Sequence, residues 1–272
     1  MANGIPHKSC TACEAKIIIL ERSDNMTERI FALKKDSVDL RDYTFQPDFI
    51  KDLLPEKVDM RAKMPPVVDQ SKLGSCTANA IVSGLRQFLR IKHREPNTIL
   101  SRLYLYWHMR EVEGTLGKDA GSSIRDGMKL LSKIGVCPEK DFPYVISTYN
   151  DKPSAEAEAH AADYKIKEYC RIPDLTMLKV AVAEGYPVVF GFQVYSSFKS
   201  DEATQTGRVP LPQEGEELLG GHAVLAVGYD DFNEVVICRN SWGRQWGDHG
   251  YFYLPYDFWA YNLHHDMWTA KK

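Results

Sequence analysis

The sequence predicts an α+β fold in which a helical first half is followed by a β-rich second half. Apolar side chains recur at helical spacing after residue 76, and a second helical period covers residues 100–113. Short apolar runs typical of strands then dominate, at 185–194, 222–229, 234–240 and 250–254. With 272 residues, 44% of them apolar, the chain can bury a large core as one two-lobed domain or as two small ones.

In the first half, a helix should run from Cys76 to about His93. It should end before Pro96, because proline disfavours helix in the residue that precedes it. Gly114 should close the helix over 100–113. Further helical segments are expected at 122–134 and 154–162.

In the second half, Asp174 should cap a helix that runs to Glu184. Strands are expected at 164–172 and in the four apolar runs named above. Residues 196–217 are predicted to form a polar loop. His264 and His265 are adjacent in the tail, but no cysteine or carboxylate frame suggests a metal site, so we interpret them as surface residues.

Charge and hydropathy indicate neither a nucleic-acid partner nor a membrane span. The net charge is -3 and no basic cluster occurs. The longest aliphatic run near the start, Ile17–Leu20, is too short for a signal-peptide core or a span, and residues 1–13 lack a basic lead-in. We therefore expect a chain made without a cleaved secretory signal, which is cytoplasmic or exported by a route that needs none.

The six cysteines are spaced in a way that gives little support to disulfides, although an even count would suit them. We expect reduced cysteines. Cys10 and Cys13 have the spacing of a redox pair or half a metal site, but no second pair lies nearby, so we interpret them as a pair without function.

Cys76 follows a Gly74–Ser75 turn and should lie in the first turn of its helix. The first backbone N–H groups of a helix have no internal partner, and the helix dipole places partial positive charge there. Both effects favour the thiolate, which is the nucleophilic form of cysteine. A small buried core residue is an equally good interpretation of Cys76 taken alone.

Two distant stretches favour the nucleophile. His222 begins an apolar strand that leads to Val-Gly-Tyr229, and Asn240 ends another strand and opens the run Asn-Ser-Trp-Gly-Arg-Gln-Trp-Gly247. Gln70 precedes Cys76 by six residues. The order along the chain is therefore glutamine, cysteine, histidine and asparagine.

These motifs and their order resemble the papain-like, cathepsin-type cysteine proteases, and are most similar to the bacterial and viral branch that lacks a full-length propeptide. His222 lies 146 residues after Cys76, within the spacing of about 130–150 expected for papain-like chains, and Asn240 lies somewhat beyond it. The sequence departs from the family pattern at Leu73, where a disulfide cysteine is usual, and at Thr77, where tryptophan is common.

The resemblance implies a two-lobed fold, with a helical left lobe, an antiparallel β-barrel right lobe and the active-site cleft between them. The helical lobe would take roughly residues 67–163, and the β lobe roughly 164–272 with the leading strand of 41–66. Residues 41–272 would then form the peptidase domain, and residues 1–40 an N-terminal extension or short pro-segment. Residues 1–37 either lie in the cleft as an autoinhibitory contact or form a loose tail.

The resemblance also implies a mechanism that uses no metal and no cofactor. Cys76 would form a thioester with the substrate, and His222 would act as acid and base within a thiolate–imidazolium pair at rest. Asn240 would orient His222, and Trp242 would cover their hydrogen bond. The Gln70 side chain and the Cys76 backbone N–H would form the oxyanion hole.

The expected substrate is a peptide or protein, cleaved by endopeptidase action, and the enzyme is expected to be a monomer. By position, the substrate-binding residues would be Gly121, Ser122, Val189, Gly191, Gly221, Ala223 and Trp242. Small apolar walls favour a hydrophobic side chain two residues before the scissile bond. Exopeptidase action and a non-hydrolytic peptide-binding or acyl-transfer relative remain as alternatives.

Overall fold

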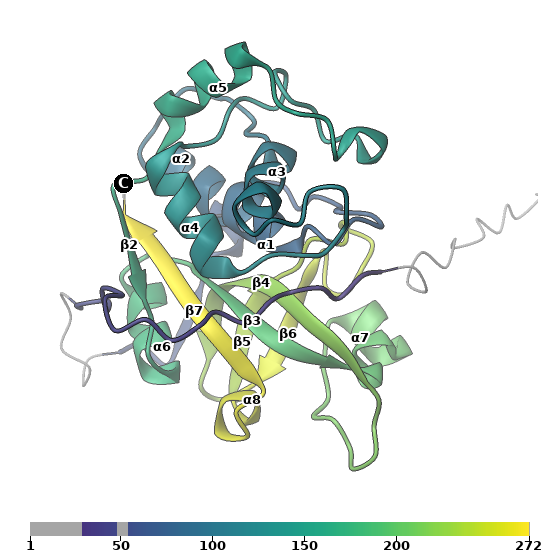
Figure 1. The fold of residues 1–272 in the computed structure, drawn as a ribbon. Helices are drawn as coiled ribbons and strands as arrows, with labels where there is room; N and C mark the ends of the chain where they lie inside the picture. The colour runs from purple at the N-terminus through teal and green to yellow at the C-terminus, as the bar shows by residue number, and fades with distance from the viewer. Residues whose placement is uncertain (1–28, 48–53, 272) are drawn as a thin grey trace, which may run out of the picture.

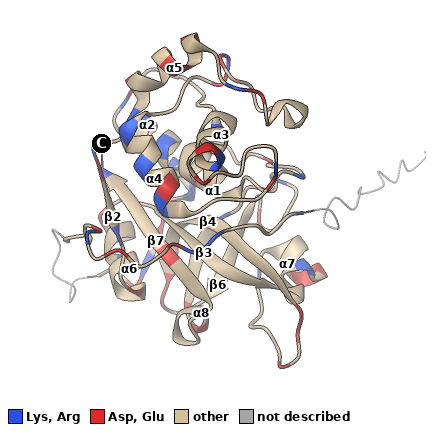
Figure 2. Ribbon diagram, in the orientation of Figure 1, with Lys and Arg blue, Asp and Glu red and all other residues tan. Residues whose placement is uncertain are grey.

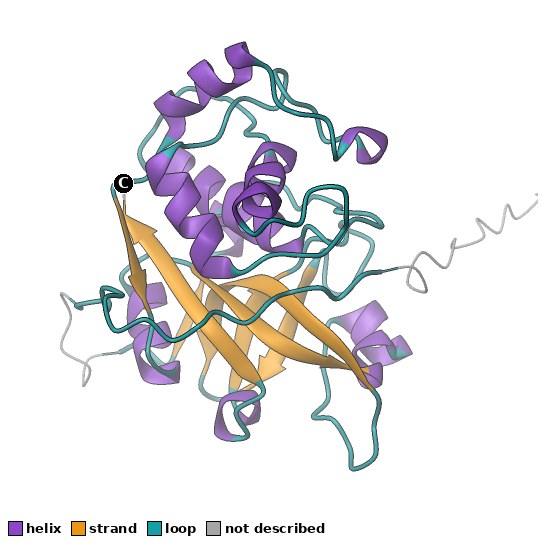
Figure 3. Ribbon diagram, in the orientation of Figure 1, coloured by secondary structure: helices purple, strands orange, loops and turns teal. Residues whose placement is uncertain are grey.

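The computed structural model describes residues 29–47 and 54–271. A group of helices packs on one side of an antiparallel sheet, and the helical part comes mainly from the first half of the chain (Figures 1 and 3). The α+β fold predicted from the sequence is therefore confirmed. Cys10, Cys13 and the greater part of the N-terminal extension lie outside the described residues.

The helical part is built around one continuous helix that starts at Cys76. It comprises α1 (Cys76–Ala78), a π-helical stretch (Asn79–Arg86) and α2 (Gln87–Lys92), so the expected end near His93 is confirmed. The other helices here are α3 (Arg102–Val112), α4 (Ile124–Lys133) and α5 (Ala155–Ala161). Serine side chains cap α3, α4 and α5 by accepting a backbone N–H, at Ser101, Ser123 and Ser154.

The sheet has the strand order β2-β7-β3-β4-β5-β6, and β1 pairs with β4. All of these pairings are antiparallel. The strands are β1 (Lys57–Asp59), β2 (Glu168–Arg171), β3 (Val188–Tyr195), β4 (Leu218–Asp230), β5 (Val235–Arg239), β6 (Tyr251–Pro255) and β7 (His264–Lys271). Among the described residues β2 and β6 do not pair with each other, so the expected barrel is an open sheet.

Smaller helices fill the connections. These are α6 (Leu175–Ala183), α7 (Asp201–Thr206) and α8 (Asp257–Ala260), with single 3₁₀ turns at Arg61–Lys63, Ile146–Thr148, Ala162–Tyr164 and Ser196–Lys199. Asp174 caps α6 through the N–H of Met177, as predicted.

Two predictions for the second half were wrong. The expected loop over 196–217 contains α7, which Ser200 caps at its start and Gly207, with φ 74°, ends. The expected tail is strand β7, which pairs with both β2 and β3. His264 and His265 are therefore partly buried in a strand, because the apolar residues that follow them, such as Trp268, carry this strand into the core.

The continuous helix packs directly on β4. Gly84 lets the two elements approach closely, since a Cβ at this position would lie 3.0 Å from Leu225 Cδ2. The helix that carries Cys76 is thus fixed against the strand that carries His222.

Charged residues of both signs are spread over the helices and loops, and most strand residues are uncharged (Figure 2). No helix in the described part of the chain is both long and apolar enough to cross a membrane.

Candidate active site

Cys76 lies at the start of the continuous helix and is fully buried. Burial raises the pKa of its thiol, and hydrogen bonds from the backbone N–H groups of Ala223 and Thr77 oppose this only in part. The Thr77 hydroxyl also donates to the carbonyl of Ser122, at 3.0 Å. The threonine that replaces the usual tryptophan therefore joins the helix start to the neighbouring loop.

His222 lies on β4 and is held by Asn240, which follows β5. Its Nε2 lies 2.9 Å from Asn240 Oδ1, and the same oxygen accepts the backbone N–H of Ser241 at 2.8 Å. Because that oxygen accepts, Nε2 carries the proton and Nδ1 of the neutral ring has a free lone pair. Within the described residues Nδ1 has no hydrogen-bond partner. This nitrogen is therefore free to take a proton.

Trp242 lies against the imidazole ring of His222. The ring centres of His222 and Trp242 are 5.0 Å apart with an interplanar angle of 32°. The ring of Phe198 packs against the rings of both His222 and Trp242. The hydrogen bond between His222 and Asn240 is thus enclosed by apolar rings, where low polarity strengthens it.

The expected thiolate–imidazolium pair is not favoured in this arrangement. Burial lowers the pKa of His222 to about 4, although its hydrogen bond to Asn240 acts in the opposite direction. Burial also raises the pKa of Cys76. Both groups are therefore neutral while the site is covered, because each loses the water that would stabilise its charge.

Gln70 is fully enclosed, and it is fixed by two hydrogen bonds of its side-chain amide and one of its backbone N–H. Its Nε2 donates to Leu73 O at 3.0 Å, its Oε1 accepts from Ser241 Oγ at 2.6 Å, and its backbone N–H donates to Ser241 O at 2.8 Å. The amide has a second Nε2–H, which the expected oxyanion hole requires. Gln70 is thereby joined to the residue that follows Asn240.

Residues 29–36 run through the space between the helical part and the sheet (Figure 1). Leu33 N–H donates to Gly221 O at 3.1 Å, and Lys34 N–H donates to Ser122 O at 3.4 Å. Both pairings are parallel bridges, one to each wall. The segment lies over the site, where Cys76 and His222 are both 0% exposed.

Residues 31–33 of the segment lie against several of the residues that are predicted for substrate binding. Phe31 lies edge-on to the rings of His222 and Trp242, at 6.1 and 5.8 Å between centres. A Cβ on Gly191 would lie 2.4 Å from Leu33 Cδ2. A Cβ on Gly121 would lie only 1.7 Å from the carbonyl oxygen of Ala32. Because Gly121 and Gly191 have no side chains, the segment has room to lie against them.

Val189 and Ala223 are fully buried in strands, as buried as Ser122. Val189 lies on β3 opposite Leu225, and Ala223 lies on β4 opposite Gly191. Ala223 also contributes a backbone hydrogen bond to the Cys76 sulfur. Ala223 therefore lies beside the nucleophile.

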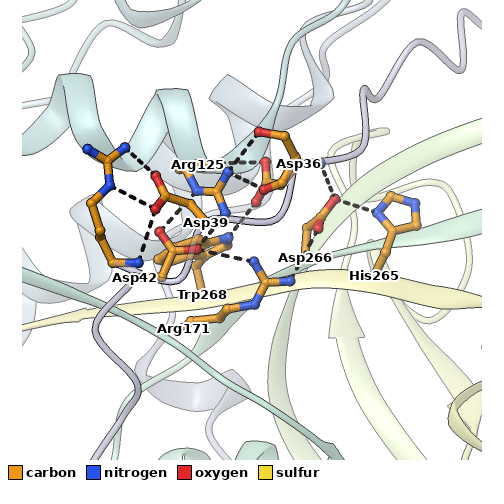
Figure 4. Close-up of polar contacts among 10 residues, drawn as sticks. Asp36, Asp39, Asp42, Arg125, Arg171, His265, Asp266 and Trp268 are labelled. Atoms are coloured by element: carbon orange, nitrogen blue, oxygen red, sulfur yellow. Dashed lines mark hydrogen bonds and ion pairs between the residues drawn. The ribbon is translucent and has the colours of Figure 1, made fainter.

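The segment is anchored at both ends by charged contacts. At one end Arg29 donates to Asp69 Oδ1 at 2.7 Å and lies over the Trp242 ring. At the other end Asp36 and Asp42 meet Arg125 and the last strand (Figure 4). Farther along the chain, Phe45 is buried beside the sheet, with its N–H bonded to Arg171 O at 2.9 Å.

Sequence reasoning missed Asp119, which joins the two loops beside the helix start. Its carboxylate accepts the N–H of Gly74 at 2.8 Å and the hydroxyl of Tyr106. That hydroxyl in turn accepts the N–H of Gly121 at 3.3 Å. No periodic pattern marks Asp119, since its partners lie in separate loops and on a helix.

Comparison with known proteins agrees with this geometry. The family described as papain family cysteine protease matches residues 54–267. A peptidase C1-like protein of Acanthamoeba polyphaga mimivirus is 42% identical over 216 residues, which cover 75% of this chain and 69% of that one. Cysteine proteinase 2 of Entamoeba histolytica is 33% identical over 213 residues, covering 72% and 62%.

Among solved structures, xylellain, a cysteine protease from Xylella fastidiosa, is 40% identical with a TM-score of 0.83, and the match covers 90% of this chain and 97% of that one. The resemblance predicted from the glutamine, cysteine, histidine and asparagine motifs is confirmed, and the chain belongs to the papain family of cysteine proteases.

Proposed function

We propose that Cys76, His222 and Asn240 carry out the peptidase reaction of this chain, and that it acts as an endopeptidase. The observation that carries this assignment is the geometry of His222, whose Nε2 is committed to Asn240 while Nδ1 has no partner among the described residues. A base held in one orientation with one free nitrogen is what proton transfer from a thiol requires.

The reaction then follows as acyl transfer. His222 Nδ1 takes the proton of the Cys76 thiol, and the thiolate attacks the carbonyl carbon of the scissile bond. The second Nε2–H of Gln70 and the Cys76 backbone N–H stabilise the oxyanion. The C–N bond breaks as His222 gives its proton to the leaving amine, which leaves a thioester. Water attacks the thioester with His222 as base, the C–S bond breaks and the thiol is restored.

We also propose that residues 29–37 restrain the enzyme by lying in the cleft. Three observations support this: the segment bonds to both walls through Leu33 and Lys34, Phe31 lies against His222, and the nucleophile has no exposed surface. Burial under the segment also favours neutral Cys76 and His222, so it opposes formation of the reactive ion pair. A peptide substrate therefore competes with the segment for one site.

Labelling of Cys76 tests both proposals. An epoxide reagent near pH 6, followed by mass spectrometry, should modify Cys76 slowly in the full chain, because ordinary thiols are protonated there and this one is covered. A Leu33→Asp variant, which places a carboxylate against an apolar wall, should label fast, and His222→Ala in the same background should remove the gain. Cys76 that resists in every variant would overturn the catalytic assignment.

Product analysis with an end-blocked peptide separates the modes of action. Internal cleavage by the Leu33→Asp variant supports endopeptidase action. Cleavage only of peptides with a free end would support an exopeptidase. Rapid labelling without cleavage of any peptide would favour a binding or acyl-transfer relative. We expect a monomer in these assays, which the elution volume on a sizing column checks.

A further inference from the structure

Glu113 presents a carboxylate to the cleft at the C-terminal end of α3. Its Oε1 accepts a hydrogen bond from the backbone N–H of Ser123 at 2.9 Å, and its Oε2 accepts one from the ammonium group of Lys34. The Glu113 side chain is 10% exposed, and that of Lys34 is 37% exposed. One oxygen is therefore fixed by the protein, and the other contacts the peptide that lies in the cleft.

The position of this carboxylate is set by the fold. Ser123 is the N-cap of α4, where the helix dipole favours a nearby negative charge. The backbone hydrogen bond orients the carboxylate before any peptide arrives, so little ordering is needed when a cation binds. An ion pair between two exposed side chains is not oriented in advance in this way, and it contributes little to the free energy of binding.

Neighbouring residues of the segment reach opposite walls, as side chains of an extended strand do. Leu33 contacts Gly191 on the sheet, whereas Lys34 contacts Glu113 on the helical side. Ala32, the residue before them, bridges to Gly221 beside His222. The cleft thus holds, moving outward from His222, a small residue, an apolar residue and a basic residue.

We propose that Glu113 is a specificity-determining residue that selects substrates with lysine or arginine three residues before the scissile bond. This inference rests on the proposed peptidase function. His222 protonates the leaving amine, so the leaving part of the substrate lies on the side of Trp242, and the acyl part lies toward Gly191 and Glu113. The segment runs from Trp242 at Arg29 to Glu113 at Lys34, opposite to the chain direction of such a substrate. The side-chain positions of Leu33 and Lys34 then receive the second and third residues before the scissile bond.

The test measures kcat/KM in the full chain carrying Leu33→Asp, with the peptides acetyl-X-Leu-Ala-aminomethylcoumarin. X is lysine, norleucine or glutamate, so that length is nearly constant while charge changes. Lysine should be favoured over norleucine about fivefold, which is the size of a partly exposed ion pair, and glutamate should be poorest. The preference for lysine should shrink as salt is raised.

Glu113→Gln keeps an oxygen that accepts the Ser123 N–H but removes the charge. It should bring the lysine-to-norleucine ratio close to one, chiefly by lowering kcat/KM for the lysine peptide. Glu111→Gln is the matched control, since this neighbouring carboxylate is 46% exposed and pairs with His108. It should leave the ratio as it is.

A second measurement needs no open cleft. In the otherwise unaltered full chain, Lys34→Met and Glu113→Gln should each speed labelling of Cys76 about threefold, and the double variant should label no faster than either one, because both remove the same contact.

The outcomes separate the two proposals. Equal cleavage of the three peptides, unaffected by Glu113→Gln, overturns this inference and leaves the peptidase assignment standing. Cys76 that labels fast while no peptide is cleaved overturns the peptidase assignment, and this inference with it. Fully additive effects of the two substitutions on labelling would also count against the contact.

Discussion

The backbone N–H of Asp36 donates to Oδ2 of Asp266 at 2.7 Å, and so joins the N-terminal segment to strand β7. The carboxylate of Asp36 accepts the N–H of Arg125 at 3.0 Å and Nε1–H of Trp268 at 2.8 Å (Figure 4). Burial, and then the charge of Asp266, raise the pKa of Asp36. The carboxylates of Asp36 and Asp266 are thus held close together by the N–H groups that donate to them. Docking of the segment in the cleft therefore depends on those donors.

Arg125→Ala should release the segment. The guanidinium binds Asp42 through Nε at 3.1 Å and also contacts Ser37 O, so its loss leaves Asp42 with weaker partners in a half-buried position. Charged hydrogen bonds of this kind are worth about 1.5–3 kcal/mol, so Cys76 should label at least about tenfold faster than in the unaltered chain.

The control is Arg41→Ala. Arg41 is exposed and pairs with Asp39 within the turn at residues 38–43, which follows the segment, so its removal should not change the labelling rate. Equal rates for the two variants would mean that the Arg125 contacts do not hold the segment in place.

Acid should weaken docking of the segment between about pH 6.5 and pH 4. His222 has a pKa of about 4 while covered, against an ordinary value of 6.5. Its contribution to docking is therefore complete above pH 6.5 and is lost progressively as the pH falls from 6.5 to about 4, since protonation then favours the open cleft. Asp36 acts in the opposite direction, because its raised pKa means that protonation favours the docked state.

Hydrogen exchange measures this balance directly. The amides of Leu33 and Lys34 bond to the two walls, so their protection factors report docking and correct for the intrinsic effect of pH. Protection should fall from pH 7 to pH 5. His222→Gln, which cannot titrate, should remove this fall and leave only the opposite effect of Asp36, and a fall that persists in this variant would assign the effect to another group.

Gln70→Ala should reduce kcat with little change in KM. The lost donor acts on charge that develops in the transition state, and removal of one such donor costs about 2.7–4 kcal/mol, or roughly 10²–10³ in kcat. The comparison is Ser241→Ala, which keeps the amide but removes the hydroxyl that bonds to Gln70 Oε1. Its effect should be below tenfold. Steady-state kinetics in the Leu33→Asp background provide both values, and a change confined to KM would argue against an oxyanion role.

Gly121→Ala should both expel the segment and impair turnover. A Cβ here would lie 1.7 Å from the Ala32 carbonyl oxygen, a contact that cannot be relieved by rotating a side chain. Gly117→Ala is a matched control, because this glycine has a similar positive φ of 85° but no atom within 4 Å of its added Cβ. The two variants should share the backbone strain, and only Gly121→Ala should lower the protection of the Leu33 amide.

The parts of this fold that were predictable from sequence depend on local signals. The helix from Cys76 follows a turn and carries its own apolar period, and its end is marked by Pro96. His222 and Asn240 could be paired because each lies in a motif with fixed neighbours. Their hydrogen bond in the structure has the partners expected from these motifs. The predicted start of the strand at His222 was wrong, since β4 begins four residues earlier, at Leu218.

The parts that the sequence left open or missed depend on contacts between distant residues. Residues 29–36 have no periodicity of their own, and their bridges reach Gly221 and Ser123, far along the chain, so a contact in the cleft and a loose tail both stayed open. Whether the sheet closes depends on pairing between β2 and β6, which no local pattern determines. Helix α7 was the exception, since Ser200 at its start and Gly207 at its end are recognisable capping residues.

The turn around residues 38–43 has a consequence for how inhibition would end. Val38, Leu40 and Tyr43 project into solvent there, between the cleft-bound residues and the buried Phe45. While the chain is intact, the short tether gives the segment an effective concentration in the millimolar range, so even weak contacts keep it bound. A single cut in this turn would make binding bimolecular, and at micromolar enzyme the released peptide would dilute away. Activation would then require one peptide bond to be broken, with no change in the fold.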